Sequence, residues 1–190
     1  KFAVVKDPIV KNPCFEIRLP KKAEKGIKTI DVLTQEQMRV YCQFATEKYS
    51  NGKPMYRLGC GLVLILFPGL RLGEALGLRW EDINFGKQSL KVERTLEYVK
   101  NRNTVPGEPR YCFVEGSTKT TAGDRTIPLN QTALQALREL QKINGQFPQM
   151  FANAAGKPIN PRNLNRAHDC ILERAGIPHI GIHALRHTFA

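Results

Sequence analysis

The chain has 190 residues and a formal net charge of +12, which suits one domain whose partner is an anion, most often nucleic acid. The longest apolar run, residues 58–70, is shorter than the ~20 residues of a membrane span and contains Pro68, so it predicts a buried helix and no membrane span. The 5 cysteines are odd in number and none forms a Cys-x-x-Cys pair, which argues against a disulfide framework and predicts a cytoplasmic protein with reduced thiols.

Residues 1–30 are rich in lysine and proline, which is typical of a basic linker or extended arm. The candidate DNA contacts in this arm are Lys21, Lys22, Lys25 and Lys28. Composition leaves open whether the arm binds phosphates or is a solvated tail. The chain begins at Lys1 without a methionine and ends at Ala190 without a helix stop signal, so we expect a fragment at both ends.

Three helices are predicted in the first half of the chain. The first follows Thr34, which can cap it, and places Tyr41 and Phe44 at helical spacing. Residues 55–67 predict a second helix that is apolar nearly all round and therefore central, and Pro68 with the following glycine ends it. Residues 71–78 predict a short third helix.

The middle of the chain changes character. Three β-branched or aromatic stretches, SLKVERT, RYCFVEG and RTIPLN, predict one small antiparallel sheet of three strands. Helical spacing resumes over residues 132–144 and 161–175, and a last helix is expected to begin near His183. This order predicts an α+β fold that is mostly α-helical, with the helices around a small antiparallel three-stranded sheet.

The stretch GLRLGEALGLRW contains the first candidate site. Gly69 permits a tight turn before a helix, so Arg71 projects from the helix start. Glu74 lies on nearly the same helix face and can orient the guanidinium. Taken alone, the pair would equally suit a surface ion pair.

The stretch HALRHTFA contains the second candidate site. It places His183 and Arg186 on one helix face, with His187 one turn beyond the first histidine. Two histidines at this spacing suggest a metal site, but a zincin helix needs a glutamate directly after the first histidine, where this chain has Ala184. A third candidate is Lys119, which the turn-forming stretch STKTTAGDRTIPL places on a predicted β-hairpin.

Together, LTQEQM, GLRLGEALGLRWEDI, TKTTAGDRTIPL and HALRHTFA resemble, in this order and spacing, the catalytic domain of the tyrosine recombinase (phage integrase) family of phages and mobile elements. The resemblance implies a catalytic domain over residues 31–190, with residues 1–30 as a linker or the end of a preceding DNA-binding region. The matched catalytic positions are Arg71, Lys119, His183 and Arg186. The matched supporting positions are Glu74 and His187.

The chain departs from the family pattern at three places. Pro68 stands where a small hydroxyl residue is usual, and Gly123 stands where serine is common. The box that supplies the family's nucleophilic tyrosine is missing, since all 5 tyrosines precede His183. We therefore assign the nucleophile to no residue of this chain, and we expect the chain by itself to bind DNA weakly without cleaving it.

The resemblance implies DNA strand cleavage and rejoining by transesterification through a 3′-phosphotyrosine, without a cofactor or a metal ion. Arg71 and Arg186 would stabilise the charge that develops on the phosphate, and Lys119 would protonate the leaving 5′-oxygen. His183 would either assist deprotonation of the tyrosine or donate a hydrogen bond to the phosphate. The expected partners are double-stranded DNA and further protomers on paired DNA sites.

Two other functions remain open on sequence grounds. A non-catalytic DNA-binding module or regulator would suit the charge but would need no cluster of Arg71, Lys119, His183 and Arg186. A metal-dependent nuclease would require a carboxylate cluster at a histidine site, which the sequence does not offer.

Overall fold

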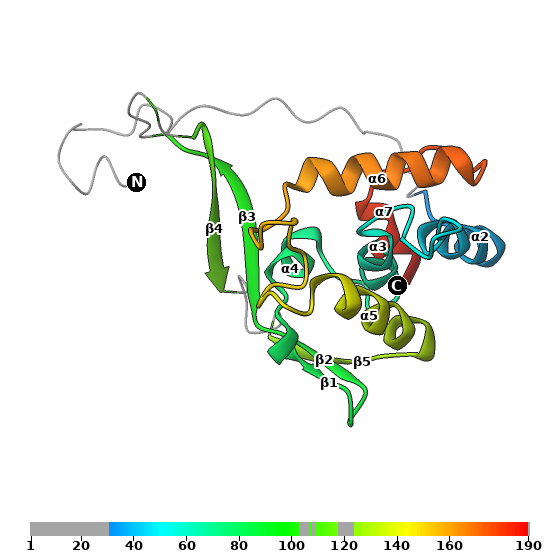
Figure 1. Ribbon diagram of the computed structural model, residues 1–190, viewed down its shortest axis with the longest axis horizontal. Helices are drawn as coiled ribbons and strands as arrows, with labels where there is room; N and C mark the ends of the chain where they lie inside the picture. The colour runs from blue at the N-terminus through cyan, green and yellow to red at the C-terminus, as the bar shows by residue number, and fades with distance from the viewer. Residues whose placement is uncertain (1–30, 103–106, 108, 118–123, 190) are drawn as a thin grey trace, which may run out of the picture.

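The computed structural model describes residues 31–102, 107, 109–117 and 124–189. Within these ranges a helical body carries a three-stranded sheet at one end and a two-stranded hairpin at its side (Figure 1). The mostly helical α+β class predicted from the sequence is confirmed. The helices are α2 (Gln35–Ala45), α3 (Gly59–Leu66), α4 (Leu72–Gly77), α5 (Gln131–Asn144), α6 (Pro161–Arg174) and α7 (His183–Phe189), with a 3-10 turn at Trp80–Asp82.

Helix α2 begins where the sequence predicts it. The Thr34 hydroxyl accepts a hydrogen bond from the Gln37 backbone N–H at 3.2 Å, and the Gln37 side chain accepts one from the Thr34 N–H at 2.9 Å. This reciprocal capping box satisfies two amide groups that the helix itself leaves unpaired. The apolar face of α2 lies against the core, where Tyr41 is fully buried.

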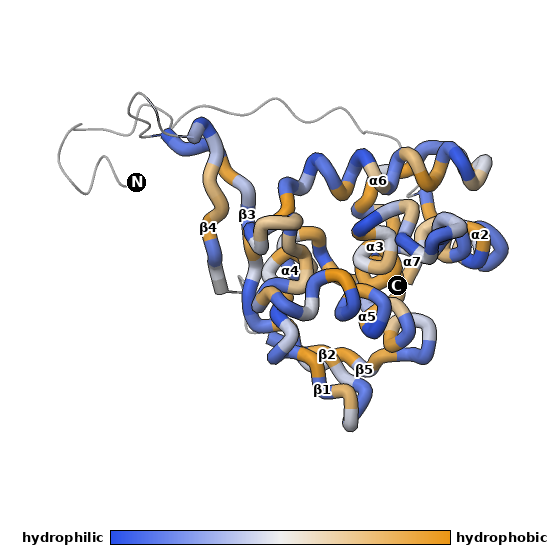
Figure 2. The backbone as a smooth tube through the Cα atoms, viewed as in Figure 1, coloured by the Kyte–Doolittle hydropathy of each residue, from blue (hydrophilic) through white to orange (hydrophobic). Residues whose placement is uncertain are grey.

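Helix α3 is the centre of the body. All of its residues are buried, and it contacts α2, α4, α5, α6 and α7. The surrounding helices α2, α5 and α6 alternate hydrophobic and hydrophilic residues, as expected of helices with one face on a core (Figure 2). The predicted start at residue 55 is wrong, because the helix begins at Gly59. A Cβ atom at Gly59 would lie 1.7 Å from the Ala45 carbonyl oxygen, so the end of α2 and the start of α3 meet backbone to backbone.

The predicted small antiparallel three-stranded sheet is present, but its strands are not the three predicted stretches. Strands β1 (Ile83–Asn84), β2 (Ser89–Val92) and β5 (Arg125–Pro128) form an antiparallel sheet in the order β1-β2-β5. Strands β3 (Arg94–Lys100) and β4 (Tyr111–Ser117) form a separate antiparallel hairpin. The stretch SLKVERT is therefore divided at Glu93 between two sheets. Alternating residues indicate strands, but they do not determine which strands pair.

The β3–β4 hairpin extends beside the helical body (Figure 1). Its aromatic residues pack across the strands: the Tyr98 ring lies 5.3 Å from that of Tyr111 and 4.8 Å from that of Phe113, centroid to centroid. Helix α4 packs on β3 through glycines. A Cβ atom at Gly77 would lie 3.1 Å from the Arg94 carbonyl oxygen, which is tighter than nearly all such contacts.

A buried polar pair joins α2 to α6. The Nε2 atom of His168 lies 2.9 Å from the Ile180 carbonyl oxygen, which can only accept a hydrogen bond, so Nε2 carries the proton. The other ring nitrogen, Nδ1, therefore accepts a hydrogen bond from the Tyr41 hydroxyl at 2.8 Å. Both polar groups are thus satisfied inside the core.

The helices in the described part of the chain can be compared with what a membrane-spanning helix requires. None of its helices combines the length and the apolar composition that crossing a bilayer requires.

Candidate active site

The first part of the candidate site is the turn between α3 and α4. Gly69 adopts a φ of 63°, and the Leu70 N–H donates to the Ile65 carbonyl oxygen at 3.2 Å, which closes the end of α3. Arg71 then has an extended backbone and is the N-cap residue of α4. The sequence predicts that Arg71 begins the helix, but the helix begins one residue later because Arg71 caps it.

Glu74 is the centre of the site. Its side chain is only 1% exposed, and its carboxylate accepts the Arg71 backbone N–H at 2.8 Å and the Arg71 Nη1 at 2.8 Å. Arg71 is therefore held at both its main chain and its side chain by one acidic group. The Arg71 side chain is nevertheless 57% exposed, so it remains accessible to a ligand.

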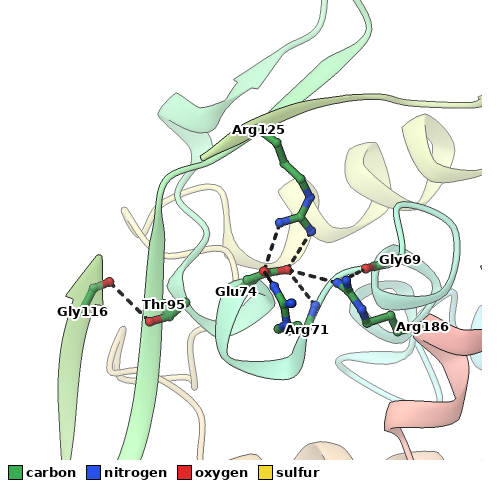
Figure 3. A network of polar contacts seen from close by, with 7 residues as sticks. All are labelled: Gly69, Arg71, Glu74, Thr95, Gly116, Arg125 and Arg186. Carbon is green, nitrogen blue, oxygen red and sulfur yellow. Dashed lines mark hydrogen bonds and ion pairs between the residues drawn. The ribbon is translucent and has the colours of Figure 1, made fainter. Parts of the chain in front are cut away.

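A second arginine, Arg125 at the start of β5, reaches the same carboxylate. Its Nη1 donates to Glu74 Oε1 at 3.0 Å, and its Nη2 donates to Glu74 Oε2 at 2.9 Å. This is the paired, fork-like geometry in which a guanidinium binds a carboxylate best. Figure 3 shows the Arg71, Arg125 and Arg186 side chains converging on Glu74 from different elements.

Arg186 joins the cluster from α7. Its Nη1 donates to the Gly69 carbonyl oxygen at 2.7 Å and lies 3.7 Å from Glu74 Oε2. The turn that carries Arg71 thus also holds Arg186. A Cβ atom at Gly69 would lie 2.6 Å from Cδ1 of Phe189, so glycine is needed there both for the positive φ and for the packing of α7.

The two histidines of α7 stand edge to face, with ring centroids 4.8 Å apart. Partial burial, followed by the positive charges of His187, Arg186 and Arg71, lowers the pKa of His183 below its ordinary value of 6.5. A lowered pKa favours the neutral imidazole at neutral pH, which can accept a proton.

The electrostatics of the cluster favour an anion. Burial by itself would raise the pKa of Glu74, but hydrogen bonds from Arg125 and Arg71 lower it to about 2, so the group is ionised. Three guanidiniums meet this one carboxylate, which leaves surplus positive charge around the exposed face of Arg71. Among the described residues, no three histidine, cysteine or acidic side chains lie close enough together to hold a metal ion.

The structure therefore brings together Arg71, Glu74 and Arg186, as the sequence predicts. The charges of both arginines contribute to the lowered pKa of His183. Lys119 and the four arm lysines lie outside the described residues. Sequence reasoning missed Arg125. No sequence signal identifies it, because the need of Glu74 for donors beyond Arg71 follows from its burial, which only the structure shows.

Comparison with known proteins agrees with the fold. The chain belongs to the phage integrase family, whose model matches residues 31–190.

Similar curated proteins come from bacteria and their mobile elements. The chain is 30% identical to a tyrosine recombinase XerC-like protein of Caldanaerobacter subterraneus subsp. tengcongensis, over 100% of this chain and 50% of that protein. It is 26% identical to the transposase from transposon Tn916 of Enterococcus faecalis, over 99% of this chain and 47% of that protein. The chain therefore spans about half the length of these relatives.

Solved structures show the same fold. The integrase of transposon Tn1549 in complex with transposon right-end DNA superposes with a TM-score of 0.70 at 22% identity, over 99% of this chain and 60% of that chain. A lambda integrase dimer bound to a core site superposes with a TM-score of 0.52 at 19% identity, over 99% of this chain and 59% of that chain.

Proposed function

We propose that this chain is part of a tyrosine-type site-specific recombinase that cleaves and rejoins duplex DNA in the integration of a mobile element. The observation that carries the proposal is the meeting of Arg71 and Arg186, from opposite ends of the described domain, at one buried carboxylate. A non-catalytic DNA-binding module would not require this cluster. Family membership and relatives solved with bound DNA add support.

The proposed reaction has two balanced steps. A tyrosine hydroxyl gives up its proton and its oxygen bonds to the phosphorus, while the bond from phosphorus to the 5′-oxygen breaks and that oxygen takes a proton. A 5′-hydroxyl then gives up its proton and bonds to the phosphorus, while the bond from phosphorus to the tyrosine oxygen breaks and that oxygen regains a proton, which reseals a strand. Because each broken phosphate ester is replaced by a new one, first to tyrosine and then to a 5′-oxygen, neither step consumes a nucleotide cofactor.

Each catalytic residue has a proposed role, and His183 has two alternatives. Arg71 and Arg186 bind the non-bridging phosphate oxygens and stabilise the charge of the transition state. His183, kept neutral by its lowered pKa, either accepts the proton of the tyrosine or hydrogen-bonds the phosphate, with His187 beside it. The resemblance to the family assigns to Lys119 the protonation of the 5′-oxygen. No tyrosine of this chain matches the nucleophile, so we propose that the chain alone binds DNA without cleaving it.

Two further parts of the proposal concern binding. The arm lysines (Lys21, Lys22, Lys25 and Lys28) are proposed to contact DNA phosphates, because their charge favours an anion. Recombination exchanges strands between two duplexes, so further protomers on paired sites are proposed partners. Assembly of several protomers on DNA is also consistent with the structure of lambda integrase, which is a dimer bound to a core site.

The test uses the complete gene product and a nicked duplex from the boundaries of the genetic element that carries the gene. Cleavage beside a nick releases a short strand and traps the protein covalently on DNA, which a denaturing gel detects. Arg71→Ala and Arg186→Ala should each reduce the rate of trapping by about 10²–10³-fold while duplex binding stays within a few-fold. The control is Arg174→Ala, whose arginine pairs with Glu47 at 3.0 Å outside the cluster. Near-normal trapping by either cluster variant would refute the assignment.

A further inference from the structure

The unexplained residue of the cluster is Arg125. It lies at the start of β5, it belongs to none of the positions that the sequence singles out, and its side chain is 26% exposed. Both of its terminal nitrogens donate to the Glu74 carboxylate, at 3.0 and 2.9 Å. A guanidinium used in this way is directed at the protein and not at a ligand.

The hydrogen bonds of Glu74 define what Arg125 does. An ionised carboxylate has about four acceptor positions. Arg71 occupies two of them through its backbone N–H and its Nη1, and Arg125 occupies the other two. Arg186 is left with a charge contact at 3.7 Å and takes its close hydrogen bond from the Gly69 carbonyl oxygen instead. Each oxygen of Glu74 therefore has one donor from α4 and one from β5.

We propose that Arg125 is a positioning residue, which locks the Glu74 carboxylate in one orientation so that Glu74 in turn fixes the guanidinium of Arg71. This inference rests on the proposed function, in which Arg71 binds the phosphate. Without Arg125, the buried carboxylate of Glu74 loses half of its hydrogen bonds. The two hydrogen bonds from Arg71 that remain hold the Glu74 side chain less firmly in one orientation. A misplaced guanidinium stabilises the transition state less well.

The first experiment is a double-mutant cycle in the complete gene product, measured as the single-turnover rate of trapping on the nicked duplex at saturating protein. Arg125→Gln removes the charge and the fork, and Glu74→Gln removes the negative charge and replaces one acceptor oxygen by an NH₂ donor. We expect Arg125→Gln to slow trapping by about 10–100-fold, with duplex affinity changed by no more than about threefold. If Arg125 acts through Glu74, the double variant should be no slower than the slower single variant, within about threefold. Multiplied effects would overturn the proposal, because they would mean that Arg125 acts on the DNA directly.

A conservative variant separates positioning from charge. Arg125→Lys keeps the positive charge but cannot donate two parallel hydrogen bonds to both carboxylate oxygens. We expect it to recover only part of the rate, and full recovery would overturn the proposed role of the fork. Arg174→Gln is the matched control, since it removes the same charge from an ion pair outside the cluster and should leave the rate unchanged.

A second measurement does not depend on cleavage. The Nε–H signal of Arg71 in a ¹⁵N-correlation spectrum, identified by its loss in Arg71→Lys, reports how well that guanidinium is ordered. It should shift or broaden in Arg125→Gln and stay unchanged in Arg174→Gln, with circular dichroism confirming that both variants fold.

An unchanged Arg71 signal in Arg125→Gln would overturn the positioning role even if the enzyme is active. If the wild-type product traps no DNA, the proposed function fails, while the spectrum still decides whether Arg125 orders Arg71. For a variant that does not fold, Arg125→Lys supplies the same measurement.

Discussion

Replacing Glu74 by glutamine should destabilise the fold in a way that depends on pH. Hydrogen bonds from Arg125 and Arg71 outweigh the effect of burial and lower the pKa of Glu74 from 4.5 to about 2. Each tenfold change in proton affinity corresponds to ~1.4 kcal/mol, so the ionised group contributes about 3 kcal/mol to stability at pH 7. Its folded pKa lies below its unfolded pKa, so this contribution is present above pH 4.5 and is lost as the pH falls toward 2. At pH 3 the same relation leaves about 1.4 kcal/mol.

The measurement is urea unfolding of the wild-type chain and Glu74→Gln, followed by circular dichroism from pH 3 to 7. The difference in the free energy of unfolding should shrink by about 2 kcal/mol from pH 7 to pH 3. The control is Glu139→Gln, because Glu139 is a more exposed carboxylate that pairs with Lys48 and Lys142 at 2.6 Å each. Such surface pairs typically contribute about 0–1 kcal/mol, so its effect should be small at every pH. A Glu74→Gln difference that stays constant from pH 3 to 7 would show that charge is not the reason for the loss.

The remaining predictions concern the core and the arm. Tyr41→Phe should cost about 1–3 kcal/mol in urea unfolding, because it leaves the buried Nδ1 of His168 without its hydrogen-bond partner, and an unchanged stability would contradict a stabilising role for this hydrogen bond. Burial lowers the pKa of His168 below 6.5, so the contribution of its neutral form to stability is complete above pH 6.5 and declines as the pH falls below that value. His168→Gln should remove this part of the pH dependence of the free energy of unfolding. Replacing the four arm lysines by glutamine should reduce the slope of log binding constant against log salt by about 0.9 for each lysine that contacts a phosphate, and an unchanged slope would indicate a solvated tail.

Features encoded by neighbouring residues could be predicted from the sequence. Thr34 and Gln37 are close enough along the chain to form a capping box, and Arg71 and Glu74 share a helix face for the same reason. The apolar run predicts a central helix because a helix that is hydrophobic all round has to be buried, although its first residue was placed too early.

Features that depend on distant pairing could not be predicted. Arg125 lies 51 residues from Glu74 in the sequence, and no spacing rule connects a strand start to a helix. The partition of the strands into two sheets depends in the same way on the pairing of β2 with β5 and of β3 with β4. Arg186 could be assigned to the cluster only through the family resemblance, since its hydrogen bond to the Gly69 carbonyl joins residues 117 positions apart.

The glycines of α4 have a consequence for how robust the cluster is. Cβ atoms at Gly73 and Gly77 would lie 3.5 and 3.1 Å from the carbonyl oxygens of Leu96 and Arg94, so this face of the short helix rests on the peptide groups of β3. Main-chain surfaces have the same shape whatever side chains a strand carries. The contact between α4 and β3 therefore depends mainly on the backbone, so we expect exposed residues of β3 and β4 to vary in sequence with little effect on the position of Arg71.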